Sequence, residues 1–280
     1  MIIKNAFLHL DTGLVEKGDL RIEDGKIAAL GDNLTDGAEK DYIGKHIYAG
    51  AMAFFAPARQ ETDSPILPLI DAWYAIEPAE LKAQAFAKQG ITDVIMVPGN
   101  KNVISGYCAV IKASGNSLAD LTVKQKVAMK GAVTNEVVET YRPLGAPKAP
   151  IGPMGMVRLL QYALSGLDEL ADVREGKLPL LMSCCHDFEI RRVLEATQQW
   201  PNIKLLFHGC AANEKLEKEI VDRGAMLLDS CPRRMAEVFG VDHRIGALKE
   251  GLDADLAVYA ADGRQGLLET LVNGQVVYHV

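Results

Sequence analysis

The middle of the chain, residues 49–238, alternates apolar strand-like runs with helix-like patterns, and no other feature limits the possible folds as strongly. The strand-like runs are Ile47–Phe55, Thr92–Val97, Tyr107–Ala113, Val123–Met129, Leu178–Cys184, Ile203–His208 and Ala225–Asp229. Helical spacing of apolar residues marks Pro78–Gln89, Pro153–Leu170, Phe188–Gln199 and Asn213–Arg223. Alternating β and α units of this kind predict a parallel sheet with covering helices.

Both ends of the chain predict short strands separated by turns. These strands are Ile2–Leu10, Asp19–Glu23, Lys26–Leu30, Leu256–Tyr259, Thr270–Val272 and Gln275–Val280. The pairs Asp24-Gly25 and Asn273-Gly274 are typical hairpin turns. Neither end has enough strands to be stable alone. We therefore expect residues 1–48 and 240–280 to form one composite β-sandwich domain, and residues 49–239 to form the α/β domain.

The composition argues against several classes of protein. The formal net charge is −7 and no block of basic residues occurs, so nucleic-acid binding is not expected. No apolar run approaches the roughly 20 residues that span a membrane. The N-terminal run MIIKNAFLHLD has neither the apolar core nor the cleavage site of a signal peptide. The five cysteines are therefore expected to be reduced thiols in a cytoplasmic protein.

Two long motifs resemble a known family. Residues 90–115, GITDVIMVPGNKNVISGYCAVIKASG, are similar to G-V-T-T-V-x-V-x-P-G-x-x-N-V-I-G-G-x-x-x-V-I-K. Residues 244–259, RIGALKEGLDADLAVY, are similar to R-I-G-S-L-x-x-G-x-D-A-D-L-V-V. Both patterns are those of the amidohydrolase superfamily, and of its imidazolonepropionase-like group in particular. The resemblance implies an α/β fold, here a shortened TIM-like (β/α) barrel of about seven strands, with a small β-sandwich formed by both termini.

The same resemblance implies a metal-dependent chemistry, the hydrolysis of non-peptide C–N bonds in cyclic amides or N-acyl compounds. One or two divalent metal ions lower the pKa of a bound water molecule and polarise the scissile carbonyl. The family's ligands are two histidines after strand 1, a Lys or Glu after strand 4, and histidines after strands 5 and 6. An Asp at the end of the last strand acts as general base.

The stretch that should carry the first histidine pair has lost it. Residues 44–60, GKHIYAGAMAFFAPARQ, align with the family pattern G-K-x-V-x-P-G-x-I-D-x-H-x-H. In this alignment Phe55 and Pro57 replace the two histidines, and Ala53 replaces the Asp. Since neither Phe nor Pro offers a lone pair to a metal ion, this part of the implied site cannot bind one.

The other ligand positions are also largely substituted. Lys130 lies within about one position of the strand 4 ligand, and Ser183 and Cys185 replace two histidines after strand 5. His208 matches the family's histidine after strand 6. The last strand and its Asp are missing, because residues 229–232 lead almost directly into the final helix at residues 233–239. His208 is thus the main survivor of the implied site.

Two functional hypotheses follow. In the first, the chain is a catalytically degenerate amidohydrolase that needs no cofactor and acts as a ligand-binding, structural or regulatory protein. In the second, it is an active hydrolase with a remodelled site, because His208 and Cys210 share one face of their strand and point with Cys185 toward the barrel mouth. These residues suit Zn²⁺, and a thiol nucleophile beside His186 or His208 is another form of this hypothesis.

The missing strand has consequences for packing. Strands 1 and 7 lose their usual neighbour, so we expect that they either pair directly with each other, with distortion, or are covered by a second chain. We also expect the protein to form at least a homodimer. We expect Phe55, Met52 and Cys185 to fill the volume of the lost metal ion and its water. The barrel mouth is the predicted site for a small-molecule ligand.

Overall fold

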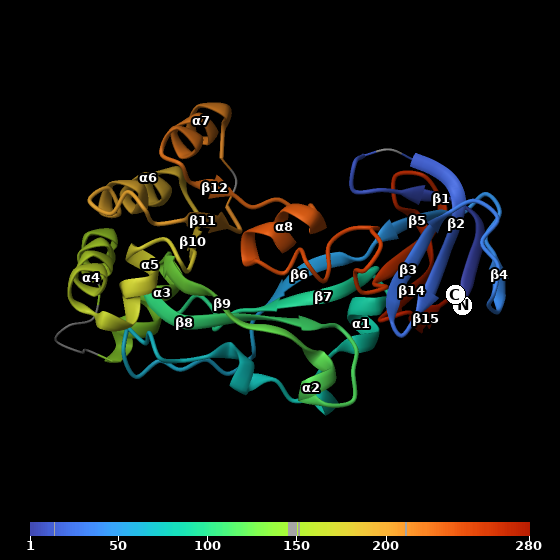
Figure 1. Ribbon diagram of the computed structural model, residues 1–280. Helices are drawn as coiled ribbons and strands as arrows, with labels where there is room; N and C mark the ends of the chain where they lie inside the picture. The colour runs from blue at the N-terminus through green and yellow to red at the C-terminus, as the bar shows by residue number, and fades with distance from the viewer. Residues whose placement is uncertain (14, 145–149, 151, 211) are drawn as a thin grey trace.

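Two β-sheets organise the chain (Figure 1). The computed structural model describes residues 1–13, 15–144, 150, 152–210 and 212–280. Within these residues, the first sheet has eight strands, in the order β15-β14-β13-β5-β1-β2-β3 with β4 paired to β1. Its strands are β1 (Ile2–His9), β2 (Val15–Glu23), β3 (Lys26–Gly31), β4 (Glu39–Asp41), β5 (His46–Ala49), β13 (Leu256–Ala261), β14 (Gln265–Val272) and β15 (Gln275–His279).

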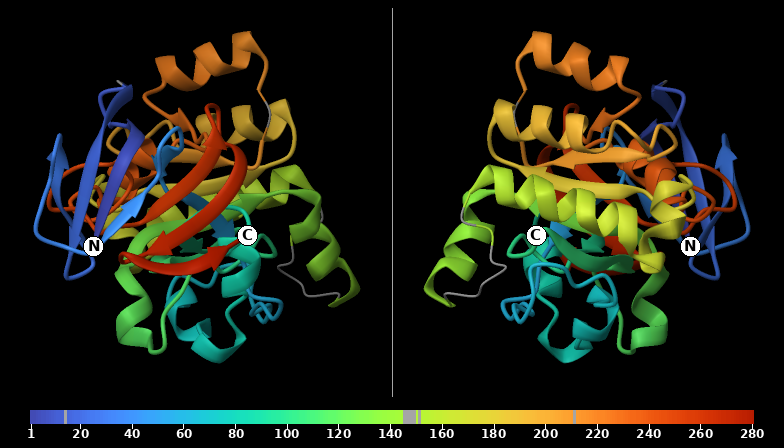
Figure 2. Two further views of the ribbon diagram at one scale, coloured as in Figure 1. Left: turned by 90° about the vertical axis from the view of Figure 1, so that its right-hand side faces the viewer. Right: turned by 90° about the vertical axis from the view of Figure 1, so that its left-hand side faces the viewer.

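The two ends of the chain meet in this terminal sheet. Strand β5 pairs with β1 on one side and with β13 on the other, so N-terminal and C-terminal strands lie side by side (Figure 2). Apolar side chains from both ends share one buried cluster, which includes Ile3, Leu20, Ile47, Leu256 and Val258. The expected union of the two termini is therefore present. Its division into two sandwich layers, and the exact domain boundaries, stay predictions.

The second sheet has seven described strands, in the order β12-β11-β10-β9-β8-β7-β6. They are β6 (Ala51–Phe55), β7 (Ile91–Met96), β8 (Ile104–Lys112), β9 (Thr122–Val133), β10 (Leu180–Cys184), β11 (Leu205–His208) and β12 (Met226–Leu227). Each overlaps one of the seven apolar runs that predicted a strand. Apolar runs of this length therefore located the strands correctly.

The expectation of a purely parallel sheet is wrong. Strand β8 runs antiparallel to both β7 and β9, while the other neighbouring pairs are parallel. Only residues 97–103 join β7 to β8, and only residues 113–121, with the short helix α2 (Leu118–Leu121), join β8 to β9. A parallel crossover takes about a dozen residues or more, so connections this short favour antiparallel neighbours.

Besides α2, the described helices are α1 (Ala83–Ala87), α3 (Asn135–Tyr141), α4 (Pro153–Gly166), α5 (Ala171–Arg174), α6 (Asp187–Ala196), α7 (Glu214–Asp222) and α8 (Pro232–Phe239), with 3₁₀ turns η1 (Ala72–Ala75), η2 (Pro78–Glu80), η3 (Arg142–Leu144) and η4 (Asp168–Leu170). Helices lie on more than one side of the second sheet, with α6, α7 and α8 above it and α1 and α2 below it in Figure 1. The helix expected at residues 78–89 is split into η2 and α1, because Leu81 is extended, with ψ at 127°. No helix in the described ranges is long and apolar enough to cross a membrane.

Helix α8 covers the inner face of the second sheet. Its Met235 and Phe239 join a buried cluster with inward side chains of the strands, among them Met52, Ile95 and Leu206. Strands β6 and β12 do not pair in the described sheet, so a closed barrel is not seen and the predicted direct pairing is wrong. The chain turns from the two-residue β12 into α8, which fills the concave face instead of extending the sheet.

A buried charge cluster joins the two sheets. The Lys112 ammonium on β8 is fully buried and lies 3.0 Å from Asp253 Oδ2 and 3.4 Å from Asp93 Oδ1, and it also pairs with Asp255. Burial alone would lower the pKa of Lys112, but the three carboxylates outweigh it and raise that pKa. Burial, with the nearby Asp93, raises the pKa of Asp255 to about 7. Asp253 and Asp255 lie just before β13 of the terminal sheet, whereas Asp93 and Lys112 lie on β7 and β8 of the second sheet. The cluster therefore links the two sheets.

Candidate functional site at the carboxyl ends of the inner strands

The inward side chains at the carboxyl ends of β9, β10 and β11 include positions at which the sequence resemblance implies metal ligands. Strand side chains alternate faces, so Lys130, Ser183 and His208 point inward two residues beyond Ala128, Leu181 and Leu206, which belong to the inner cluster. Ala128, Leu181 and Leu206 therefore mark the inner face of the sheet.

An aromatic side chain packs on the surviving histidine. The ring of Phe54 on β6 lies with its centroid 3.7 Å from that of His208, tilted by 39°. On its other side Phe54 meets Phe239 of α8 edge-on, at 6.2 Å and 74°. The inner face next to His208 is therefore filled by apolar rings.

The expectation that Phe55 fills the site is wrong. Phe55 lies on the opposite face of β6 and packs edge-on against Phe86, with ring centroids 5.7 Å apart. Met52 and Phe54 face inward, and Ala56 packs against the same inner cluster. A shift of one residue moves every side chain of a strand to the other face, and the pairing of β6 with β7 is irregular between Ala51 and Met52. Phe54 was missed because the motif spacing alone fixed the expected face.

A pocket of about 220 Å³ opens at this end of the strands. Its lining residues are Asn100, Thr134, Asn135, Glu136, Ser183, Cys184, Cys185, His186, His208 and Gly209. Three of the predicted site positions, Ser183, Cys185 and His208, thus share one pocket. Pro57 follows β6 and is half-buried, and neither it nor Lys130 nor Cys210 lines the pocket.

One lining residue carries an unused polar group. The hydroxyl of Thr134 is buried and has no hydrogen-bond partner among the described residues. A buried hydroxyl without a partner costs roughly 1–3 kcal/mol, so such groups usually meet a ligand or an ordered water molecule. Sequence reasoning missed Thr134, although its place directly after the buried end of β9 is a signal of a site residue at a strand's carboxyl end.

Burial on the inner face disfavours the charged forms of its ionisable groups. Lys130 is fully buried, its ammonium donates to the Gly131 carbonyl oxygen at 2.6 Å, and burial lowers its pKa to about 8. Burial, and then the charge of Lys130, lower the pKa of His208 to about 4. At neutral pH His208 is therefore an uncharged imidazole in an apolar setting.

The thiols around the pocket are also in their protonated form. Burial is the largest cause that raises the pKa of Cys184, of Cys185 and of Cys210. The buried carboxylate of Glu189 accepts hydrogen bonds from the backbone N–H groups of Cys185, at 2.6 Å, and His186, at 3.0 Å, and further raises the pKa of Cys185. Reactive or metal-binding cysteines have lowered pKa values, so these thiols are poor nucleophiles and poor ligands.

These residues do not fit the divalent metal ion that the sequence resemblance implies. In the described part of the chain, His208, Cys185 and Cys210 do not form a group whose ligand atoms all lie within 4.8 Å of one another. Phe54 covers one face of the His208 imidazole, and Lys130 is a buried amine whose ammonium donates to the Gly131 carbonyl oxygen. A catalytic metal site keeps three protein ligands and an open position, which this donor set does not supply.

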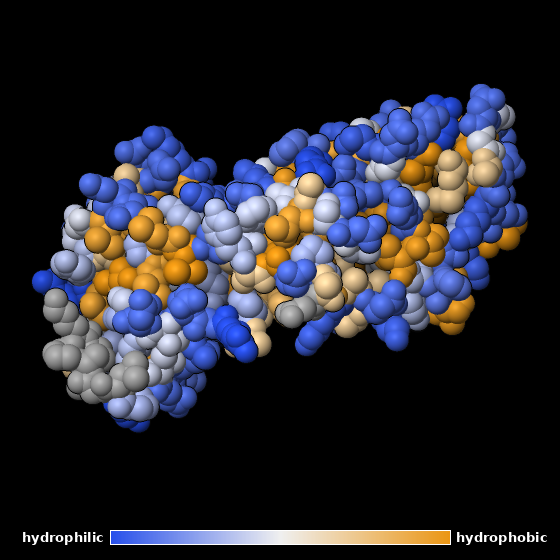
Figure 3. Space-filling view, turned by 90° about the horizontal axis from the view of Figure 1, so that it is seen from below, coloured by the Kyte–Doolittle hydropathy of each residue, from blue (hydrophilic) through white to orange (hydrophobic). Residues whose placement is uncertain are grey.

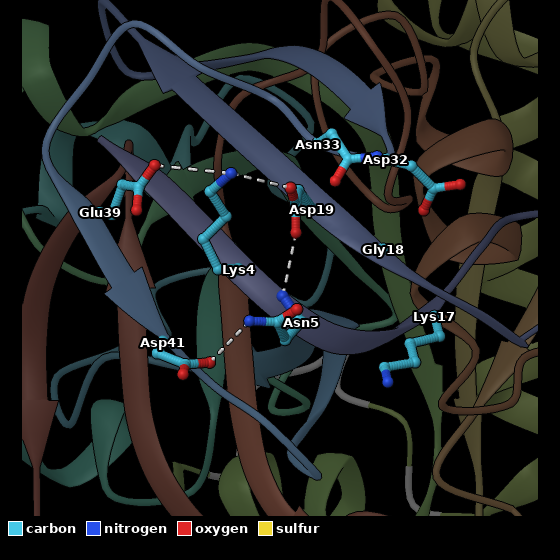
Figure 4. A pocket seen from close by; sticks show the side chains of 9 residues that line it. All are labelled: Lys4, Asn5, Lys17, Gly18, Asp19, Asp32, Asn33, Glu39 and Asp41. Atoms are coloured by element: carbon cyan, nitrogen blue, oxygen red, sulfur yellow. Dashed lines mark hydrogen bonds and ion pairs between the residues drawn. The ribbon is translucent and has the colours of Figure 1, made fainter.

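Two larger hollows lie elsewhere on the molecule. A polar cavity of about 610 Å³ lies over β1, β2 and β4, and three of its charged side chains pair with one another (Figure 4). Lys4 Nζ lies 3.2 Å from Asp19 Oδ2 and 3.5 Å from Glu39 Oε1, and Asn5 donates to Asp41. An apolar groove of about 470 Å³ lies between residues 64–70 and α4, in a hydrophobic part of the surface at the left of Figure 3.

Comparison with known proteins supports the fold. An amidohydrolase from Thermotoga maritima MSB8 superposes with a TM-score of 0.80 at 18% identity, over 100% of both chains. A prolidase complexed with N-methylphosphonate-L-proline gives 0.57 at 11% identity, over 100% of this chain and 99% of the other. The L-hydantoinase (dihydropyrimidinase) from Arthrobacter aurescens gives 0.55 at 12% identity, over 99% and 96%. The chain has the amidohydrolase fold.

This fold is the one that the two long sequence motifs indicated, so the resemblance is confirmed at the level of structure. No family model and no curated protein sequence matches the chain. At identities of 18% and below, the structural likeness establishes how the chain is folded, and the function has to be argued from the site.

Proposed function

We propose that this chain is an amidohydrolase-superfamily member, nearest to the imidazolonepropionase-like group, that has lost metal-dependent hydrolysis and binds a small polar ligand. The observation that carries this proposal is the ring of Phe54, 3.7 Å from the ring of His208. The one histidine retained from the implied ligand set is thus packed against an apolar side chain.

The loss of hydrolysis follows from what the reaction needs. Hydrolysis of an amide requires an activated water molecule, a polarised carbonyl and a general base, and each contributes several orders of magnitude. On this inner face the carboxylate base is missing from the expected position in the sequence, the thiols are protonated, and the pKa of His208 is lowered to about 4. The groups retained from the implied site therefore supply neither a charged thiolate nor the carboxylate base that the implied reaction uses.

The pocket suits a compact molecule with both donors and acceptors. Its side chains Asn100 and Asn135 each donate and accept, Glu136 accepts, and Ser183 and Thr134 carry hydroxyl groups. A volume of about 220 Å³ is below the usual size of a drug-binding pocket. We therefore propose cyclic amides and N-acyl amino acids as the ligand class, because their amide groups match this set of side chains.

Titration calorimetry with hydantoin and N-acetyl-L-proline tests the binding, and incubation of each with the protein and added Zn²⁺ or Mn²⁺ tests for turnover. We expect saturable binding without hydrolysis. Ser183→Trp should fill the pocket and abolish binding, whereas the matched change of the exposed Ser165 on α4 to Trp should leave it intact. Absence of binding to the wild type would refute the ligand-binding half of the proposal.

The remodelled hydrolase is the alternative outcome of the same experiment. Metal-dependent turnover that His208→Ala removes would show a working metal site, and turnover that Cys185→Ser removes would show a thiol nucleophile. Either result would overturn the proposed loss of catalysis. A homodimer and a cytoplasmic location stay predictions, and light scattering of the purified protein tests the first.

A further inference from the structure

Three metal-binding side chains converge at one end of the terminal sheet, far along the chain from the pocket residues. His9 ends β1, His46 begins β5, and Asp262 directly follows β13. These strands are neighbours, because His46 lies opposite Phe7 of β1 and Tyr259 of β13. The sheet thus brings together residues from both ends of the sequence on a hydrogen-bonded frame.

The spacing of the three ligand atoms fits a single metal ion. His9 Nε2 lies 2.9 Å from His46 Nδ1 and 3.7 Å from Asp262 Oδ1, and the last two atoms are 4.0 Å apart. A point about 2.1 Å from all three atoms lies inside this triangle, and zinc takes histidine nitrogen and carboxylate oxygen at roughly 2.0–2.2 Å. In the described ranges, no other three such side chains bring their ligand atoms within 4.8 Å of each other.

A surrounding shell holds two of the three side chains in place. Tyr48 stacks on His9, with ring centroids 3.7 Å apart and an angle of 15°, and its hydroxyl donates to Asp262 Oδ1 at 2.6 Å. The backbone N–H of Gly263 donates to the same oxygen at 2.7 Å. Hydrogen bonds of this kind orient ligating carboxylates in metal proteins. A hydrogen bond between the two imidazoles would explain the 2.9 Å between His9 Nε2 and His46 Nδ1. It would not explain why the Asp262 carboxylate is held beside them by two hydrogen bonds.

The exposure of the group leaves room for further ligands. The side chains of His9 and His46 are 13% and 16% exposed, whereas that of Asp262 is 72% exposed. A metal ion at the common point would therefore be enclosed on the imidazole side and open to water on the carboxylate side. Three protein ligands and an open position are the arrangement of a site that exchanges a bound molecule, whereas closed structural sites use four protein ligands.

We propose that His9, His46 and Asp262 bind one divalent transition-metal ion, with Zn²⁺ as the reference ion. Two imidazoles and one carboxylate are ligands that zinc, nickel and copper accept. The site is separate from the inner-face pocket, so it holds whether or not the proposed ligand binding there is correct.

The test uses the full-length protein after treatment with a chelator. Calorimetric titration with Zn²⁺, with elemental analysis after desalting, should show one ion per chain. His46→Ala and Asp262→Asn should abolish that stoichiometric binding, and Tyr48→Phe, which keeps the ring on His9, should weaken it about 10- to 100-fold. His243→Ala, a change of an exposed histidine outside the group, should bind as the wild type does.

Thiols are the competing source of zinc binding. The variant Cys185→Ser/Cys231→Ser removes both exposed thiols and should still bind one ion. The proposal is overturned if the wild type retains under about a tenth of an ion per chain, if binding is lost with the thiols, or if Asp262→Asn and His46→Ala bind unchanged. The exposed position of Asp262 makes its variant a fair test, since that change leaves the core intact.

Discussion

Replacement of Lys112 by methionine should strongly destabilise the protein. The lysine is fully buried and pairs with Asp93, Asp253 and Asp255, whose side chains are also nearly buried. Removing one partner of a buried ion pair costs about 3–5 kcal/mol, because the remaining charges lose their compensation. For a chain of this size that corresponds to a melting temperature lower by roughly 6–15 °C.

The loss should depend on pH in a defined direction. Without Lys112, the pKa values of Asp93 and Asp255, which burial already raises, would rise further above those of the unfolded chain. A carboxyl group with a raised folded-state pKa contributes stability below its unfolded pKa, and that stability is lost as the pH rises through the folded value. The difference from wild type should therefore be largest near pH 8 and smaller near pH 5.

Urea unfolding followed by circular dichroism at pH 5 and pH 8 measures both effects. The matched control is Lys177→Met, which removes an exposed lysine that pairs with Glu175 at the surface and should leave the free energy of unfolding close to that of the wild type. A loss under about 1 kcal/mol for Lys112→Met, or a loss equal at both pH values, would refute the reasoning.

Two further substitutions and one labelling experiment have defined expected results. Lys130→Met should stabilise the protein by about 1–3 kcal/mol at pH 7 and by less at pH 10, as measured by urea unfolding curves. Burial lowers the pKa of Lys130 to about 8, below that of the unfolded chain, so protonation of this lysine at lower pH destabilises the folded state. Phe54→Ala should let water reach His208 and raise its pKa from about 4 toward the ordinary value, and a flat NMR titration near neutral pH would contradict this. Cys185 and Cys231 should react first with a thiol reagent, and the buried thiols only after unfolding.

Much of the fold could be predicted because its signals are local. Seven apolar runs of strand length became the seven described strands of the second sheet, and the helical patterns at residues 153–170, 188–199 and 213–223 became α4 with η4, α6 and α7. The helix expected at residues 78–89 failed, since its apolar spacing did not show that Leu81 is extended. Periodicity reports which face of an element is buried, but not where the backbone departs from it.

The site could be predicted only in part. His208, Ser183 and Cys185 share one pocket, as their places at strand ends indicated. The sequence did not show that Phe54, rather than Phe55, points inward, because the inward face of β6 depends on its irregular pairing with β7. A residue pattern fixes which positions alternate, whereas the pairing partner decides which of the two sets points inward.

The sequence by itself determined most of the elements and the amidohydrolase-like motifs, because each is written in a short run of residues. Tertiary structure alone decided that α8 covers the inner face and that His9, His46 and Asp262 meet. It also separated two lysines that look alike in the sequence. Lys112 meets three carboxylates, two of them from more than a hundred residues away, while Lys130 meets a single carbonyl oxygen. Charge and burial act through distance in space, which a linear pattern does not contain.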